Sequence, residues 1–421
     1  MTGTNWRIDH ECPQCGGPIT LEETDRFFAC DYCRARLHIT SNGPFQYCLV
    51  PKKNDDNLLY IPYWRFKGTA FAITEIKIHH RLMDHTRIAS SISELPYSLG
   101  FRPQTQPLSF ATRKVEGQFV PPSLPLAEVL LSMEKQLAGM GVQATAQDTL
   151  EKKYIGETTS IIYAPFKMDG RTLHDAITPK KSYLLKQSLD ERSQIDERSL
   201  TDGKAGTWHP EFFPALCPQC GWDLNGERDS CVFVCENCER AWEPSHDGLN
   251  EVSMGAVLKH SGDATYIPFW KIRPHITGIQ LDTYADLVRM ANLPKVVQKQ
   301  WETVPLEFWV PAFKIRPDVF LRMGGMLTIS APENIVYENF RRPLIYPITL
   351  PLAEAVESLK LILASLVVTK RKNYAKLPGI DISPRKSTLV LLPFVSRGNE
   401  FIYEEHNMAI QKIALTYGRN F

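Results

Sequence analysis

The feature that most constrains this chain is a pair of cysteine motifs that occurs twice, 205 residues apart. The run Cys12–Gly16 (CPQCG) recurs as Cys217–Gly221, and Cys30–Cys33 (CDYC) recurs as Cys235–Cys238 (CENC). In both copies 14 residues separate the two CxxC pairs. Two such turns bring four thiolates together, and these are soft, anionic ligands that zinc binds at the corners of a tetrahedron. The sequence therefore predicts two closed metal sites.

The repetition continues beyond the cysteines. Three further segments recur in the same order: Tyr60–Arg65 as Tyr266–Lys271, Leu124–Glu128 as Leu350–Glu354, and Tyr163–Phe166 as Leu391–Phe394. Their offsets grow from 206 to 226 to 228, so the second half carries 20 extra residues between its aromatic strand and its helix. Matching anchors in one order predict an internal duplication, with the boundary near residue 200.

At the cysteine motifs the chain resembles the zinc-ribbon superfamily, over about 25–30 residues in each half. The resemblance implies two structural zinc ions per chain, held by Cys12, Cys15, Cys30 and Cys33 and by Cys217, Cys220, Cys235 and Cys238. The alternative is iron in a rubredoxin-like site, where glycine normally follows both knuckles. Arg34 and Glu239 stand at those places in the second knuckles here, which favours zinc.

We expect an α+β fold in which each half is a zinc ribbon followed by a mainly antiparallel β unit with one or two helices. The expected ranges are 1–48 for the first ribbon, 49–200 for the first α+β unit, 201–248 for the second ribbon and 249–421 for the second α+β unit. The polar, alternately charged segment 180–204 ends the first α+β unit and reads as an exposed helix or linker.

Strands and helices follow from the residue periodicity. Alternation over 69–78, with Ala70, Ala72, Thr74, Ile76 and Ile78 on one side, predicts a strand, as do Ser160–Phe166 and Ser387–Phe394. Ser123 and Thr349 precede equivalent Leu-Pro-Leu-Ala-Glu runs, and each is expected to cap a helix. The first of these helices places Leu126, Val129, Leu130, Met133 and Leu137 on one face, and a closing helix is expected around Glu404–Leu415.

Other residues that attract attention are interpreted structurally. A shift of 205 places Ser253 opposite Cys48 and Arg26 opposite Cys231, so neither cysteine belongs to the repeated site, and each is expected to be a small, partly buried side chain. The recurring Pro-aromatic-Trp runs at 62–64 and 268–270 are interpreted as core rather than as a peptide-binding shelf. His79, His80 and His85 are expected on a solvated, basic surface.

Composition and charge limit the classes of function that this chain can have. With 48 Lys+Arg against 47 Asp+Glu, the chain lacks the strong positive charge typical of nucleic-acid-binding proteins. Four acidic and three basic residues lie in 12–38, and five acidic and two basic residues lie in 217–242, so both ribbons are anionic. Phosphate binding requires the opposite sign.

No Walker loop, GxSxG or HExxH motif occurs. We therefore expect a non-enzymatic, zinc-stabilised scaffold or adaptor that binds a protein partner. A nucleic-acid-binding protein and an enzyme with a site between the two α+β units are the alternatives. The first residues, MTGTNWRIDHECP, contain no secretory signal and no 20-residue apolar run follows, so a cytoplasmic protein without a transmembrane segment is expected.

Overall fold

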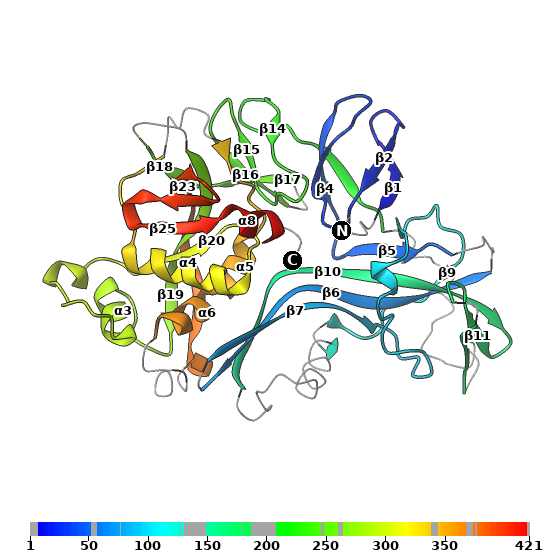
Figure 1. Ribbon diagram of the computed structural model, residues 1–421. Coiled ribbons are helices and arrows are strands. Elements are labelled where there is room, and N and C mark those ends of the chain that lie inside the picture. The colour runs from blue at the N-terminus through cyan, green and yellow to red at the C-terminus, as the bar shows by residue number, and fades with distance from the viewer. Residues whose placement is uncertain are drawn as a thin grey trace. The chain divides into compact units, whose positions relative to one another are not determined.

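A computed structural model gives the structure of the chain as two compact units (Figure 1). The described residues are 7–51, 57–75, 77–126, 128–129, 149–178, 180–186, 208–245, 248–259, 264–337, 344–367, 374 and 377–418. The first unit comprises 1–67, 84–142 and 158–214, and the second comprises 68–83, 143–157 and 215–421. This division differs from the expected ranges, because 208–214 group with the first unit and two segments of the first half group with the second.

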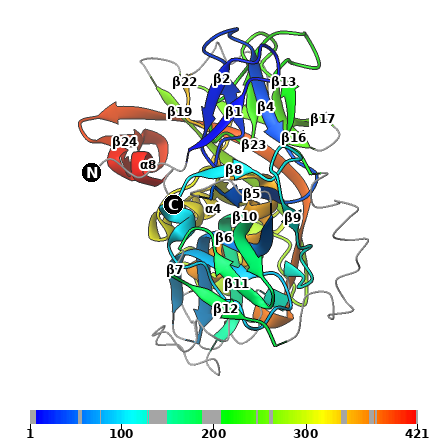
Figure 2. The ribbon, with the colours of Figure 1, turned by 90° about the vertical axis from the view of Figure 1, so that its right-hand side faces the viewer.

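The strands of the first half come in the order β1 (Ile8–Glu11), β2 (Pro18–Leu21), β3 (Phe27–Ala29), β4 (Arg36–Thr40), β5 (Phe45–Leu49), β6 (Leu58–Thr74), β7 (Ile78–Ile88), β8 (Leu108–Phe110), β9 (Gln118–Phe119), β10 (Thr149–Asp169), β11 (Thr172–Asp175), β12 (Ser182–Leu184) and β13 (Glu211–Pro214). Among the described residues of this half, a 3-10 turn, η1 (Arg102–Gln104), lies between β7 and β8. The main sheet has the order β12-β11-β10-β5-β8-β1-β2, and β6 joins it through β10 and also pairs with β7 and β9. β11 and β12 continue the sheet from the end of β10 (Figure 2).

The strands of the second half are β14 (Leu224–Asn225), β15 (Phe233–Cys235), β16 (Ala241–Ser245), β17 (Gly248–Val252), β18 (Met254–Val257), β19 (Thr265–Thr277), β20 (Phe308–Pro311), β21 (Ile335–Val336), β22 (Leu344–Ile345), β23 (Asp381–Arg397), β24 (Glu400–Tyr403) and β25 (Met408–Gln411). β14 to β17 form a four-stranded sheet beside the second cysteine group, and the larger sheet has the order β20-β19-β23-β18-β21. β22 pairs with β19, and β24 links β23 to β25.

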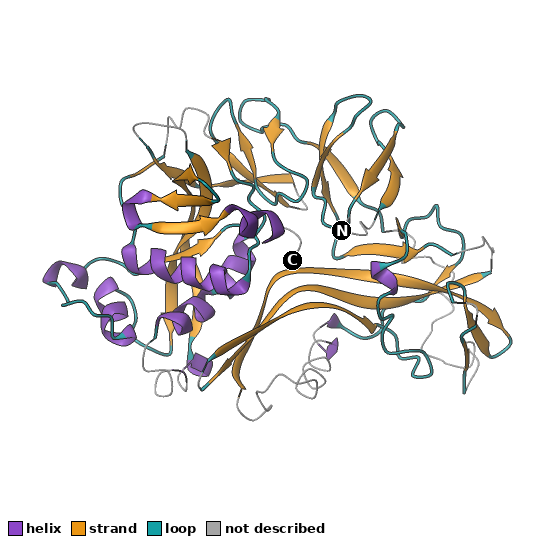
Figure 3. Ribbon diagram, in the orientation of Figure 1, coloured by secondary structure: helices purple, strands orange, loops and turns teal. Residues whose placement is uncertain are grey.

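The described helices lie mainly in the second half (Figure 3). They are α3 (Tyr284–Ala291), α4 (Pro317–Ser330), α5 (Leu352–Glu357), α6 (Leu359–Leu366) and α8 (Lys412–Gly418), with 3-10 turns η3 (Lys299–Glu302), η4 (Leu377–Gly379) and η5 (Glu404–His406). The extra residues of this half are accounted for chiefly by the segment between β19 and β20, which contains α3 and η3. Only three residues separate the corresponding strands β6 and β7.

The predicted duplication is present in the strand register. β9 runs parallel to β6 with Tyr60 opposite Phe119, and β22 runs parallel to β19 with Tyr266 opposite Ile345. The indole N–H of Trp64 donates to the Leu124 carbonyl at 2.9 Å, and the indole N–H of Trp270 donates to the Leu350 carbonyl at 2.9 Å. Equivalent side chains therefore make the same long-range bond in both halves.

The predicted helix caps are wrong. The cap residue of α5 is Pro351, which makes no side-chain cap bond. The hydroxyl of Thr349 instead accepts the N–H of Lys314 at 2.9 Å, and that of Ser123 accepts the N–H of Ser91 at 3.1 Å. These hydroxyls tie the chain to the segment that follows the neighbouring strand, so they are not available to the helix. The expected positions Leu130, Met133 and Leu137 lie outside the described residues, as does most of the linker.

The closing segment also differs from its predicted helix. Residues 404–406 form a 3-10 turn and 408–411 form β25, so helix α8 begins only at Lys412. Met408 and Ile410 are buried and alternate with more exposed neighbours, and β25 pairs with β24 over four residues. Strand pairing with a neighbour close in sequence therefore overrides the helical spacing.

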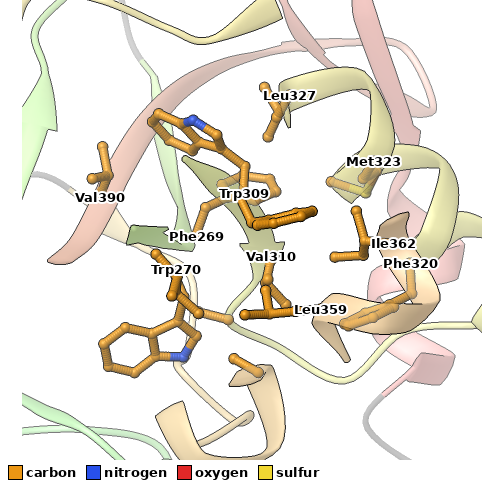
Figure 4. Packing of buried hydrophobic residues seen from close by; sticks show 14 of the residues in the cluster. Phe269, Trp270, Trp309, Val310, Phe320, Met323, Leu327, Leu359, Ile362 and Val390 are labelled. Atoms are coloured by element: carbon orange, nitrogen blue, oxygen red, sulfur yellow. The ribbon is translucent and has the colours of Figure 1, made fainter. Parts of the chain in front are cut away.

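The predicted strands at 160–166 and 387–394 are confirmed within the longer elements β10 and β23. The strand predicted over 69–78 is confirmed only over 69–74, because β6 ends at Thr74 and Ile78 begins β7. The core of the second unit gathers around β19, β20, α4 and α6, where Trp309, Val310, Met323 and Ile362 are fully buried (Figure 4). Among the described residues, no helix is long and apolar enough to cross a membrane.

Candidate metal centres

The first cysteine turn of each site has the same backbone geometry. The carbonyl of Cys12 accepts the N–H of Gly16 at 2.8 Å, and the carbonyl of Cys217 accepts the N–H of Gly221 at 2.8 Å. Both glycines have φ of 73°, a left-handed conformation that favours a residue without a Cβ. The glycine after each CPQC run therefore adopts a backbone conformation that a residue with a Cβ rarely takes.

The second turn repeats this shape without glycine. The N–H of Arg34 donates to the Cys30 carbonyl at 2.8 Å, and the N–H of Glu239 donates to the Cys235 carbonyl at 2.9 Å. Arg34 and Glu239 have φ of 60° and 56°, a conformation that costs a non-glycine residue roughly 1–2 kcal/mol. All four cysteine turns thus share one backbone conformation. In two of them a non-glycine residue adopts the positive φ at an energetic cost.

The eight predicted ligands converge in two groups of four, and within each group all sulfur atoms lie within 4.8 Å of one another. Cys12 and Cys33 approach to 3.9 Å and Cys15 and Cys30 to 3.8 Å. The pairs Cys217–Cys238 and Cys220–Cys235 are each separated by 3.5 Å.

A tetrahedral metal with bonds of about 2.3 Å to sulfur requires sulfur atoms roughly 3.8 Å apart, whereas a disulfide requires about 2.05 Å. All ten cysteines are free. Both groups therefore match the dimensions of a four-coordinate metal–thiolate site.

N–H groups donate to one sulfur atom of each group, Cys30 and Cys220, and favour its anionic form. Hydrogen bonds from the backbone of Cys33 and Tyr32 lower the pKa of Cys30 to about 7. The Asn237 side chain and the Trp222 backbone lower the pKa of Cys220 to about 6. Because a thiolate is the metal-binding form of cysteine, these donors favour that form at Cys30 and Cys220. Burial acts in the opposite direction on Cys235 and Cys238 and raises the pKa of both.

The two cysteines of each CxxC pair differ in exposure. The first cysteine of every pair is buried, namely Cys12, Cys30, Cys217 and Cys235. Cys15, Cys33 and Cys220 are exposed and Cys238 is half-buried. Each group thus joins a small core on one side and faces solvent on the other.

Apolar residues on the strands beside the second turns form a small core in each ribbon. Phe28 and Leu37 face each other across β3 and β4, and Phe233 and Trp242 do so across β15 and β16. All four side chains are buried. The two short hairpins therefore supply the ribbons' cores.

Strand β13 completes the first ribbon and was missed by the sequence interpretation. It pairs antiparallel with β4, and Phe212 stacks on His10 with ring centroids 5.3 Å apart. In the second ribbon the same edge of β16 is covered by β17, the next strand along the chain. The Glu-Phe-Phe-Pro run at 211–214 is short, and its partner lies some 170 residues earlier, so no local pattern indicates the pairing.

Glu23, between the two turns of the first ribbon, belongs to a buried ion cluster that was also missed. The guanidinium of Arg65 on β6 is fully buried and donates to Glu23 at 2.6 Å and to both carboxylate oxygens of Asp84 at 2.9 Å. The hydroxyl of Ser160 on β10 donates to the second Glu23 oxygen at 3.1 Å. The ribbon is therefore fixed to the sheet through charge as well as through apolar contacts.

The second half retains only part of this cluster. Lys271 and Glu307 stand at the positions of Arg65 and Asp84 and form an ion pair at 2.8 Å with both side chains partly exposed. Arg228 takes the position of Glu23 and is exposed. The two ribbons are thus built alike around their cysteines and attached differently to their sheets.

Of the two remaining cysteines, Cys48 is buried and Cys231 is half-buried. Burial raises the pKa of both Cys48 and Cys231, and the Cys231 thiol donates to the Ile348 carbonyl at 3.3 Å. The strand register places Ala256, not Ser253, opposite Cys48, because β17 adds residues between the second ribbon and its sheet. Both are therefore small side chains that are at least partly buried, as expected.

The other candidate residues take structural places. Tyr63, Phe269 and Trp270 are fully buried, which confirms the core interpretation of the aromatic runs. His80 is exposed and His79 and His85 are half-buried on β7. Among the described residues, only the two cysteine groups bring three or more His, Cys, Asp or Glu ligand atoms close enough together to hold a metal ion.

Comparison of the chain with protein families, curated proteins and solved structures finds no match.

Proposed function

We propose that each four-cysteine group binds one zinc ion in a zinc ribbon, and that both ions are structural. Four thiolates at tetrahedral spacing are the donor set that zinc prefers, and a site filled by four protein ligands leaves no position for a substrate water. Zinc binding then supplies folding free energy to modules whose own cores contain few side chains.

We further propose that the ribbons dock a protein partner through one exposed aromatic residue each. Tyr32 is 65% exposed and Trp222 is 57% exposed. The repeat pairs Gly17 with Trp222 and Tyr32 with Asn237. Gly17 and Tyr32 are adjacent, because a Cβ at Gly17 would lie 2.8 Å from the Tyr32 ring. The backbone N–H of Trp222 and the side chain of Asn237 both donate to the sulfur of Cys220.

At the same place beside the cysteine group, each ribbon therefore carries one large exposed aromatic residue. The second cysteine turn contributes it in the first ribbon (Tyr32), and the first cysteine turn contributes it in the second ribbon (Trp222). This recurrence supports a docking role, since tyrosine and tryptophan are enriched at the energetic centres of protein interfaces. The acidic residues of both ribbons, and the net negative charge of zinc with four thiolates, favour a partner with an apolar pocket and a basic rim.

The test is quantitative affinity capture with the wild-type chain, the double variant Tyr32→Ser/Trp222→Ser and the control Tyr97→Ser. Tyr97 is 58% exposed and lies outside the ribbons. A partner lost at least tenfold by the double variant and retained by the control supports the proposal, provided that all three proteins keep their metal. Equal capture by all three proteins contradicts it, and salt-sensitive binding of RNA or DNA favours the nucleic-acid alternative.

A further inference from the structure

The far ends of β19 and β23 form a two-stranded ribbon at the end of the larger sheet of the second unit. Over 273–277 and 381–386 these two strands pair with each other. Within the described residues, β20 pairs with β19 only as far as Ile272, and β18 pairs with β23 only from Leu389 onward. Among the described strands, this part of the sheet is therefore two strands wide, and its edges are not paired.

One face of the ribbon carries a cluster of basic side chains. Side chains alternate along a strand, and Ile276 is buried whereas Arg273 and His275 are exposed. Lys386 lies opposite Arg273, and a shift in the register makes Arg385 the extra residue of β23. Both are exposed, and Nη2 of Arg385 lies 2.8 Å from Nδ1 of His275. The basic cluster therefore consists of Arg273, His275, Arg385 and Lys386.

The arginine and lysine side chains of the basic cluster form no ion pair among the described residues. Lys271, two residues before Arg273 on the same strand, is by contrast paired with Glu307 at 2.8 Å. Like charges directly opposite each other destabilise a strand pair. Arg273 and Lys386 therefore repel each other, and a bound anion would relieve this repulsion.

The charge of this region is a property of the second half alone. In the stretches 271–280 and 368–386 together, eight residues are Lys or Arg, and Asp381 is the only acidic residue. The offsets of 206 and 228 that relate the two halves place a neutral combination at the corresponding positions of the first half, namely Lys67, Thr69, Glu157 and Thr158. The basic cluster is therefore not a consequence of the repeated fold.

The polar groups of the cluster are hydrogen-bond donors. A guanidinium can only donate, so Arg385 donates to Nδ1 of His275, and the imidazole carries its proton on Nε2. The N–H groups of arginine, lysine and this imidazole match the acceptor oxygens and the negative charge of a phosphate monoester. Residues opposite each other lie about 5 Å apart and alternate residues of a strand about 7 Å apart, so these donors can converge on one phosphate group.

A nucleic acid fits this surface less well. The reverse face of the ribbon is buried, so the ribbon cannot enter a groove as a free two-stranded ribbon does. No large exposed apolar or aromatic residue lies in 271–277 or 381–388, so bases would find no ring on which to stack.

We propose that the basic cluster binds a phosphate monoester carried by an extended segment of a partner protein. Sites for free small molecules are concave, whereas these four side chains stand on an open face. The edge of β23 before Leu389 is unpaired among the described residues, so an extended segment can add to it through backbone hydrogen bonds while its phosphate contacts the cluster. This site is independent of the cysteine groups and of Tyr32 and Trp222.

The probe is the heptapeptide Gly-Ala-Gly-phosphoserine-Gly-Ala-Gly, whose phosphorus NMR signal is followed as the full chain is added. We expect saturable binding to the wild type and roughly tenfold weaker binding to Arg273→Gln/Arg385→Gln, because two charge-assisted hydrogen bonds are lost. The matched control, Arg316→Gln/Arg397→Gln, removes the same charge from exposed arginines that are paired with Asp318 and Glu404, and should bind as the wild type does.

Two competitors identify the ligand. The same peptide with serine in place of phosphoserine should not displace the probe, and inorganic phosphate should bind roughly tenfold more weakly, because it has no backbone to pair with β23. Absence of binding to the wild type, or equal losses in the two double variants, would rule out the proposal. Inorganic phosphate that binds as tightly as the phosphopeptide would rule out a protein segment, and so would a hexauridine oligonucleotide that binds more tightly than the phosphopeptide.

Metal content and circular dichroism show whether the variants are folded. If Arg273→Gln/Arg385→Gln fails to fold, Lys386→Gln replaces it, with Arg316→Gln as its control. Lys386 is exposed, so its substitution leaves the core intact. It should weaken phosphopeptide binding in the same direction, and unchanged binding would rule out the proposal.

Discussion

Replacing Arg65 with methionine removes the centre of the ion cluster that attaches the first ribbon to its sheet. The arginine is fully buried, and Glu23, its partner at 2.6 Å, has a side chain only 5% exposed. Without the guanidinium the Glu23 carboxylate is left buried beside Asp84. Breaking a buried pair in this way costs about 3–5 kcal/mol. For a unit of this size, that loss lowers the melting temperature by roughly 6–20 °C.

The duplication provides a matched control in Lys271→Met. The Lys271 and Glu307 side chains are 20% and 31% exposed, so loss of their pair should cost about 1 kcal/mol or less. Hydrogen exchange read by mass spectrometry is the assay, because it reports each unit separately in a chain that need not unfold in one step. Arg65→Met should accelerate exchange in residues 18–29 and 58–66, and Lys271→Met should leave their counterparts nearly unchanged. Equal effects of the two variants would refute the assignment of the buried cluster as an anchor.

Two further substitutions test the packing. Gly278→Ala should destabilise the second unit by roughly 3 kcal/mol in chemical denaturation, because φ is +88° and the added Cβ would lie 2.0 Å from the Gly379 carbonyl oxygen. Gly398→Ala, with φ of +56° and open space around the Cβ, should cost only about 1 kcal/mol, and a reversed order would contradict the geometry. Cys48→Ala and Cys231→Ala should both retain two metal ions by elemental analysis, and loss of an ion from either would show that the ligand sets are wrong.

The two cysteine groups and the duplication could be predicted because both are encoded in short runs of residues that are adjacent in sequence. A CxxC turn places its own two sulfur atoms, and a repeat with fixed spacing places the second turn in both copies. The Trp64 and Trp270 anchors could be matched for the same reason, since each lies in an apolar run that recurs almost unchanged.

What could not be predicted depends on partners distant in sequence. β13 pairs with β4 across some 170 residues, and Glu23 meets Arg65 and Ser160 only after the sheet has formed. Thr349 has the residue type of a helix cap, but its hydroxyl is bound to Lys314 from another element. In each case a tertiary contact decides between alternatives that are locally equivalent.

Zinc-to-protein stoichiometry tests whether two zinc ions occupy two independent four-cysteine sites. Protein purified without added metal should contain two zinc ions and negligible iron per chain. Cys12→Ser and Cys217→Ser should each contain one, and the double variant none, because each removes a buried ligand from a different site. A wild-type ratio near one, substantial iron, or two zinc ions retained in either single variant would contradict the account.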